Sequence, residues 1–179
     1  MHSKNSIFPI LQSSRLILRQ ITQADIANVH KGLSHPEVIQ YYGVSFATLE
    51  ATQEQMDWYA NLEATETGIF WAVCLATDGT FLGVGGMNDW SKVHGKAEIG
   101  FWLLPEHWGN GYMQEAMPLI FEYGFGAMGL RRIEGFVEVE NAACKRAVAK
   151  LGFEHEGTMR DCEVKHGRVI SVDIFAKFP

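Results

Sequence analysis

The segment from residue 98 to residue 116 constrains the fold more strongly than any other part of the chain. An apolar strand pattern over 98–104 runs into Pro105, a Gly-X-Gly turn follows at Gly109 and Gly111, and a helical pattern then begins. In such a unit, free backbone N–H groups lie at the positive end of a helix dipole, where an anion such as a phosphate or pyrophosphate binds. The same spacing also occurs in plain turns, so the pattern alone leaves both interpretations open.

Two familiar phosphate-binding motifs do not fit this segment. Met113 and Gln114 stand where a P-loop needs lysine and serine or threonine, and the third glycine of the dinucleotide fingerprint is missing. A second glycine cluster at 83–86 lies inside an apolar run that no helix follows. That cluster therefore predicts a bent or bulged strand.

A second strand–helix–strand pattern lies between residues 133 and 157. A β-rich segment over 133–139 ends at Asn141, which is typical of a helix N-cap. The helix that follows ends at Gly152, with Lys150 in its last turn. Its buried stripe is predicted to consist of Cys144, Ala147, Val148 and Leu151.

Hydrophobic periodicity predicts the remaining elements along the chain. Strands are expected at 15–21, 69–76, 80–88, 96–104, 133–139, 153–162 and 169–177, and helices at 23–33, 49–63, 112–128 and 142–151. The strand–helix–strand unit around the glycine turn should be parallel with a right-handed crossover, and a ligand should bind at the carboxyl ends of its strands. We therefore expect an α/β fold with a mixed, mostly antiparallel central sheet of about seven strands flanked by helices. Pro118 should kink or shorten the helix in which it lies.

Length and composition exclude several classes of protein and indicate a cellular compartment. The 179 residues suit one domain over 1–179, with 1–13 as an N-terminal arm. A net charge of −6 argues against an extended nucleic-acid surface. Three cysteines without a Cys-X-X-Cys pair argue against a disulfide framework and fit a reducing cytoplasm. No segment reads as a signal peptide or membrane span, and the histidines show no metal-ligand spacing.

Taken together, the motifs resemble one family. The strand at 98–104, the Trp-Gly-Asn-Gly-Tyr turn at 108–112, and Asn-X-X-Cys followed by Lys-Leu-Gly-Phe-X-X-Glu-Gly at 150–157 are similar to the GNAT superfamily of acetyl-CoA-dependent N-acetyltransferases. Segments 14–19, 35–38 and 167–172 resemble its branch that acetylates ribosomal-protein N-termini, the RimJ/RimL type. The resemblance covers the chain from about residue 14 to its end.

The resemblance implies where acetyl-CoA would bind. The two parallel strands splay apart, and the gap admits the pantetheine arm, while the glycine turn holds the pyrophosphate through backbone N–H groups. Trp108 stands where the superfamily usually has glutamine or arginine. Asn141 contacts pantetheine or only caps its helix, and Lys150 meets a CoA phosphate or is simply solvated. The implied cofactor-binding residues are Trp102, Leu103, Leu104, Trp108, Gly109, Asn110, Gly111, Tyr112, Met113, Gln114, Asn141 and Lys150.

Two residues are implied as catalytic. Glu98 matches a glutamate that often serves as general base, and a carboxyl group whose pKa is raised by apolar neighbours suits that role; the alternative is a structural carboxylate. Cys144 replaces the serine that hydrogen-bonds the thioester sulfur and protonates the leaving thiolate, while Val148 replaces the tyrosine used in other branches. The alternative for Cys144 is a small buried helix residue. The oxyanion donor is expected to be a backbone N–H near Leu103.

The expected activity is transfer of acetyl to a primary amine in a direct ternary complex. Tyr41, Tyr42 and Trp90 fall in segments that line the acceptor site of similar proteins, or they belong to the aromatic core. The family analogy favours a protein N-terminal α-amine, with a polyamine, amino acid or antibiotic as the alternative, and a non-catalytic acetyl-CoA-binding module as a third. An acidic pocket would favour a polycation and an open groove a peptide. We expect a cytoplasmic monomer or homodimer that needs no metal.

Overall fold

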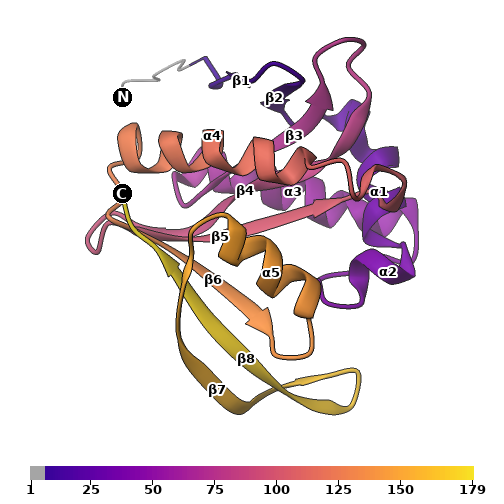
Figure 1. The fold of residues 1–179 in the computed structure, drawn as a ribbon. Helices are drawn as coiled ribbons and strands as arrows, with labels where there is room; N and C mark the ends of the chain where they lie inside the picture. Colours follow the sequence, from indigo (N-terminus) through magenta and orange to yellow (C-terminus); the bar gives the residue numbers. More distant parts are fainter. Residues whose placement is uncertain (1–6) are drawn as a thin grey trace.

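The computed structural model describes residues 7–179 and contains one eight-stranded sheet with helices on both of its faces (Figure 1). Its strand order is β1-β2-β3-β4-β5-β6-β8-β7. The strands are β1 (Leu11–Gln12), β2 (Leu16–Gln20), β3 (Ile69–Leu75), β4 (Phe81–Ser91), β5 (Lys96–Leu103), β6 (Arg132–Glu138), β7 (Glu154–Lys165) and β8 (Arg168–Lys177). The helices are α1 (Ile26–Leu33), α2 (Pro36–Ile39), α3 (Leu49–Thr65), α4 (Tyr112–Gly126) and α5 (Ala142–Lys150). The predicted mixed, mostly antiparallel α/β fold is confirmed.

The structure adds two short elements that the sequence pattern did not predict. Strand β1 lies in the segment expected to be an arm and pairs with β2, so the sheet has eight strands rather than about seven. Residues 1–6 of that arm lie outside the described residues. Helix α2 begins with Pro36 and is capped by the ring nitrogen of His35, which accepts from the Glu37 N–H at 3.3 Å.

Local chemistry fixes the helix boundaries that lead to the site. Thr22 and Asp25 form a capping box at a 3-10 turn that continues into α1. The Thr48 hydroxyl caps α3 by accepting from the Ala51 N–H at 3.1 Å. Helix α4 continues from Tyr112 to Gly126 across Pro118, so the predicted shortening at the proline does not occur.

Two apolar clusters hold the helices against the two faces of the sheet. Helices α1, α2 and α3 bury Leu33 and Tyr59, among others, against Trp102 and its neighbours on one face. Helices α4 and α5 bury Ile120 and Val148 within the larger cluster on the other face. Figure 1 shows α4 on one side of the sheet and α3 on the opposite side. In residues 7–179, no helix is both long and apolar enough to cross a membrane.

The glycine cluster of β4 allows neighbouring strands to approach closely. A Cβ atom on Gly83 would lie 2.1 Å from the Trp102 carbonyl oxygen, and one on Gly86 would lie 2.3 Å from the Ile69 carbonyl oxygen. The pairing of β4 with β3 shifts register beside Gly83. The irregular strand predicted from this cluster is therefore confirmed.

The sheet opens between β5 and β6, which are its one parallel pair among the described strands. Their pairing covers three residue pairs, from Lys96 with Arg132 to Glu98 with Glu134. Strand β5 then continues to Leu103 and β6 to Glu138, each without the other. The carboxyl ends of the two strands thus diverge, which is the splay implied by the family resemblance.

Candidate active site

The turn between β5 and α4 presents a run of unused backbone donors. Gly109 and Gly111 have φ values of 78° and 75°, a region that favours glycine, and Gly111 is the N-cap of α4. Within residues 7–179, no group accepts a hydrogen bond from the backbone N–H groups of residues 109–114. These donors lie at the positive end of the α4 dipole. The turn is therefore suited to an anion such as a diphosphate.

Side chains hold this turn in place from several directions. The Asn110 amide donates to the carbonyl oxygens of His107 and Trp108, both at 3.1 Å. The Trp108 indole N–H donates to the Leu103 carbonyl oxygen at 2.9 Å, which ties the turn to the end of β5. The Arg15 guanidinium donates to the Asn110 carbonyl oxygen at 3.2 Å. These side chains thus fix the turn, while the backbone N–H groups of residues 109–114 stay free to bind a ligand.

The edge of β5 offers fewer free groups to a pantetheine arm than the sequence suggests. The Leu104 N–H donates to the Leu82 carbonyl oxygen at 2.9 Å and so points toward β4. Because backbone groups alternate along a strand, those of Trp102 also point toward β4, and those of Leu103 point toward the opening. The Trp102 ring itself is buried in the α1–α3 cluster. Of the three residues, Leu103 alone turns its backbone to the gap.

Helix α5 packs against β6, and Cys144 lies partly buried on it. The Asn141 side chain accepts from the Cys144 N–H at 3.0 Å, which confirms Asn141 as the N-cap. Cys144 packs against the larger core cluster, and burial raises the pKa of its thiol to about 11. The Gln114 side chain donates to the Ala147 carbonyl oxygen at 3.1 Å and so joins α4 to α5. Lys150 is exposed in the last turn of α5.

Glu98 lies at the point where the two parallel strands separate. It is the last residue of β5 that pairs with β6, and its side chain is partly buried. Burial, with smaller contributions from the negative charges of Asp89, Glu134 and Glu163, raises the pKa of its carboxyl group to about 7. In the part of the chain that the structure describes, this carboxyl group has no hydrogen-bond or ion-pair partner. It is therefore poised to take up a proton near neutral pH.

The aromatic residues expected at the acceptor site do not all gather there. Tyr42 packs on the α1–α3 face, and its hydroxyl lies 3.6 Å from the place a Cβ on Gly100 would occupy. Burial, with the nearby Tyr59 and Glu98, holds the pKa of Tyr42 well above its usual range. Tyr41 is partly exposed. Trp90 packs into the cluster on the opposite face, so the structure does not bring it to Tyr42.

Two sets of long-range contacts are not predicted by any pattern in the sequence. Arg15 and Glu115, a hundred positions apart, join the segment just before β2 to the first turn of α4. Lys165, near the end of the β7–β8 hairpin, donates to the Gln40 carbonyl oxygen at 3.0 Å and pairs with Glu138 at 2.5 Å. The resemblance of segment 14–19 to the RimJ/RimL branch points to Arg15, but no sequence pattern indicates its partner. In residues 7–179, no three His, Cys, Asp or Glu side chains form a group that could hold a metal ion.

Comparison with known proteins identifies this arrangement. The family model described as acetyltransferase (GNAT) domain matches residues 15–154. The chain belongs to the GNAT acetyltransferase family. Among curated relatives, the uncharacterized N-acetyltransferase YoaA of Bacillus subtilis (strain 168) is 34% identical over 171 residues, covering 95% of this chain and 97% of that protein. The family and such relatives make this GNAT protein an N-acetyltransferase.

Solved GNAT structures share its fold. RimL, a ribosomal L7/L12 alpha-N-protein acetyltransferase in complex with coenzyme A, has a TM-score of 0.85 at 20% identity, covering 95% of this chain and 98% of that one. Spermidine N-acetyltransferase from Vibrio cholerae, in complex with CoA and spermine, has a TM-score of 0.82 at 21% identity, covering 93% and 96%. The family resemblance read from the motifs of this GNAT protein is confirmed.

Proposed function

We propose that residues 1–179 form a single N-acetyltransferase domain that moves acetyl from acetyl-CoA to a primary amine by direct attack in a ternary complex. One observation carries the proposal: the opening between β5 and β6 has the anion-binding turn at its mouth and Glu98 at its base. Relatives whose structures contain CoA support the choice of acyl donor. The proposed setting is the cytoplasm, where the three free cysteines would stay reduced.

The proposed donor site uses backbone groups more than side chains. The N–H groups of residues 109–114 would hold the diphosphate. Leu103 would offer its N–H to pantetheine or to the oxyanion that forms during transfer, since its backbone faces the gap. Acetyl-CoA supplies the activated acetyl group. Asn141 and Lys150 remain candidates for contacts farther along the cofactor.

The proposed base is Glu98, and its pKa favours one class of acceptor. A protein α-ammonium group has a pKa of about 8, so transfer of its proton to a carboxylate with a pKa of about 7 costs about 1 kcal/mol. Proton transfer from an alkylammonium group like that of lysine, with a pKa near 10.4, would cost about 5 kcal/mol. We therefore favour a protein N-terminal α-amine, of the kind that the ribosomal-protein acetyltransferases among the relatives modify.

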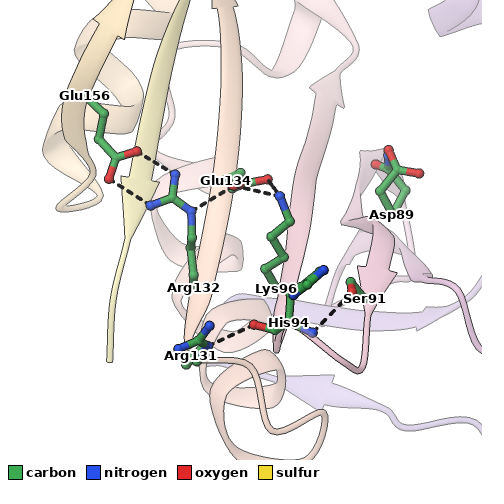
Figure 2. Close-up of polar contacts among 9 residues, drawn as sticks. Asp89, Ser91, His94, Lys96, Arg131, Arg132, Glu134 and Glu156 are labelled. Atoms are coloured by element: carbon green, nitrogen blue, oxygen red, sulfur yellow. Dashed lines mark hydrogen bonds and ion pairs between the residues drawn. The ribbon is translucent and has the colours of Figure 1, made fainter.

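A polyamine is the second candidate acceptor, and a specific observation supports it. Asp89, Glu134 and Glu163 all place negative charge near Glu98, and a polycation would be attracted to such a field. Figure 2 shows that Glu134 is held between Lys96 and Arg132, which cancels part of this field. The spermidine acetyltransferases among the relatives match this alternative.

A panel of acceptors tests the proposed function. Thiol release from acetyl-CoA should be fast with N-terminal peptides and slower with spermidine, free amino acids and aminoglycosides at equal concentration. Fast release with spermidine alone would move the assignment to the polyamine. No release with any amine, while CoA still binds tightly, would refute acetyl transfer and leave a non-catalytic acetyl-CoA-binding module.

Replacement of Cys144 by alanine is expected to lower kcat by less than about threefold. With a thiol pKa of about 11, proton transfer to a leaving thiolate whose own thiol has a pKa of about 8.5 would cost about 3 kcal/mol. We therefore propose that Cys144 serves packing and that water protonates the leaving group. Steady-state kinetics at saturating donor checks this. A hundredfold loss in kcat, restored by Cys144→Ser, would instead establish Cys144 as the proton donor.

A further inference from the structure

Arg15 makes an unusually dense set of contacts beside the glycine turn. Its guanidinium pairs with the Glu115 carboxylate at 2.5 and 2.6 Å, and its backbone N–H donates to the same carboxylate at 3.2 Å. It also donates to the Asn110 carbonyl oxygen at 3.2 Å and lies 5.0 Å from the centre of the Tyr112 ring. The Ser13 hydroxyl completes the group by donating to Glu115 at 2.6 Å. The Arg15 side chain, directly before β2, thus contacts both the turn and the first turn of α4.

The contact with Asn110 orients a peptide group of the turn. In a planar trans peptide, the carbonyl oxygen and the following N–H point in opposite directions. Because Arg15 binds the Asn110 carbonyl oxygen, the N–H of Gly111 is turned away from Arg15 and joins the unused donors of the turn. Gly111 has a positive φ, so its peptide could otherwise flip with little steric cost.

The contact with Glu115 removes an unfavourable charge. Glu115 lies in the first turn of α4, where an unpaired carboxylate would repel a bound diphosphate. Arg15 and Ser13 satisfy this carboxylate on the side toward β2. The pair is partly exposed, so its own contribution to folding is small. Its geometry is better matched to holding the turn than to general stability.

We propose that Arg15 is a positioning residue for the diphosphate of acetyl-CoA: it orients the Asn110–Gly111 peptide and neutralises Glu115 beside the anion. This inference rests on the proposed function, since it assumes that the turn binds acetyl-CoA. It adds a side chain from directly before β2 to a site otherwise built from backbone groups. Arg15 acts through the turn, not on the reacting atoms.

The test compares a donor that has a diphosphate with one that lacks it. Arg15→Gln should raise the Kd of CoA, measured by calorimetry, by about 10- to 100-fold, the range expected for hydrogen bonds to charged groups. It should leave kcat at saturating acetyl-CoA, and kcat/KM with S-acetylpantetheine, within about threefold of the wild type. Arg15→Lys should give an intermediate Kd, because an ammonium group cannot reach both partners as a planar fork does. Arg160→Gln, on exposed β7, is the matched control.

A double variant isolates the effect of the Glu115 charge on CoA binding. Glu115→Gln added to Arg15→Gln should recover several-fold of the lost CoA affinity, because the unpaired carboxylate is gone. A Kd in Arg15→Gln within twofold of the wild type would overturn the inference, as would equal losses with acetyl-CoA and S-acetylpantetheine. Failure of the wild type itself to bind CoA would overturn the proposed function, which is a separate and distinguishable result.

Discussion

Replacement of Glu98 by glutamine is expected to lower kcat by about 10²- to 10⁴-fold, the usual contribution of a positioned general base. The substitution keeps the shape of the side chain but removes its ability to accept a proton. The Kd of CoA should not change, because the proposed donor site is built from the turn after β5 and the facing edge of β5. Thiol release and calorimetry on the same preparation measure both quantities.

The pH profile gives the same prediction a second readout. The carboxyl group of Glu98 has a pKa raised to about 7 by burial, so it becomes an active base only as pH rises through 7. In the wild type, kcat/KM should therefore increase between pH 6 and pH 8. In Glu98→Gln, the part of this increase that comes from the ionisation of Glu98 should be absent. A variant that keeps at least a third of wild-type kcat would show that Glu98 is a structural carboxylate.

Stability provides the control for Glu98→Gln. In the folded protein Glu98 keeps its proton up to about pH 7, whereas an unfolded glutamate loses it near 4.5. The folded state thus binds more protons in this window, and the free energy of unfolding falls as pH rises through it. The variant lacks this titration, so its Tm relative to the wild type should rise from pH 5 to pH 8. A loss of activity together with a higher Tm at pH 8 cannot come from unfolding.

Replacement of Gly83 by alanine is expected to lower the free energy of unfolding by about 3 kcal/mol, at the upper end of the range for overpacking. The new Cβ would lie 2.1 Å from the Trp102 carbonyl oxygen and 2.7 Å from the Leu103 Cα. Both atoms are backbone, so no side-chain rotation relieves the clash, and β4 and β5 must separate. Urea unfolding measures the change.

The matched control for Gly83→Ala is Gly126→Ala. A Cβ on Gly126, the last residue of α4, would meet no atom within 4 Å. That variant should be neutral or more stable by up to about 1 kcal/mol, from the higher helix propensity of alanine. Equal stability of the two variants would mean that the strands of the folded protein are not as close as the structure places them.

Much of the fold could be predicted because local patterns determine it. The alternation at 15–21, the Asn141 cap and the glycine turn each indicate their element within a few residues, and the structure places them there. Strand β1 was missed because two paired residues leave no periodic signal. Helix α2 was missed because a four-residue helix has too few turns to show an amphipathic stripe.

The candidate site was harder to predict because it depends on the directions of backbone groups and on partners that are far apart in the sequence. Strand periodicity identifies the edge of β5 but does not say which backbone groups already bond to β4, so Leu104 looked available and is not. The sequence predicts Trp90 at the acceptor site with Tyr42, whereas in the structure a register shift in β4 near Trp90 accompanies its packing on the other face. The pairing of Arg15 with Glu115 spans a hundred residues, and no short-range pattern encodes it.

The short parallel pairing of β5 with β6 also affects how the folded protein opens locally. Among the described strands, three residue pairs between β5 and β6 form the ladder that joins β1–β5 to β6–β8. The two groups of strands are therefore natural units of sub-global opening, and the larger apolar cluster beneath α4 and α5 packs against both of them. A pantetheine arm in the gap between β5 and β6 would contact both groups of strands and hold them together. Amide protons of β6 and β8 should then exchange more slowly when the cofactor is bound, far beyond the residues that touch it.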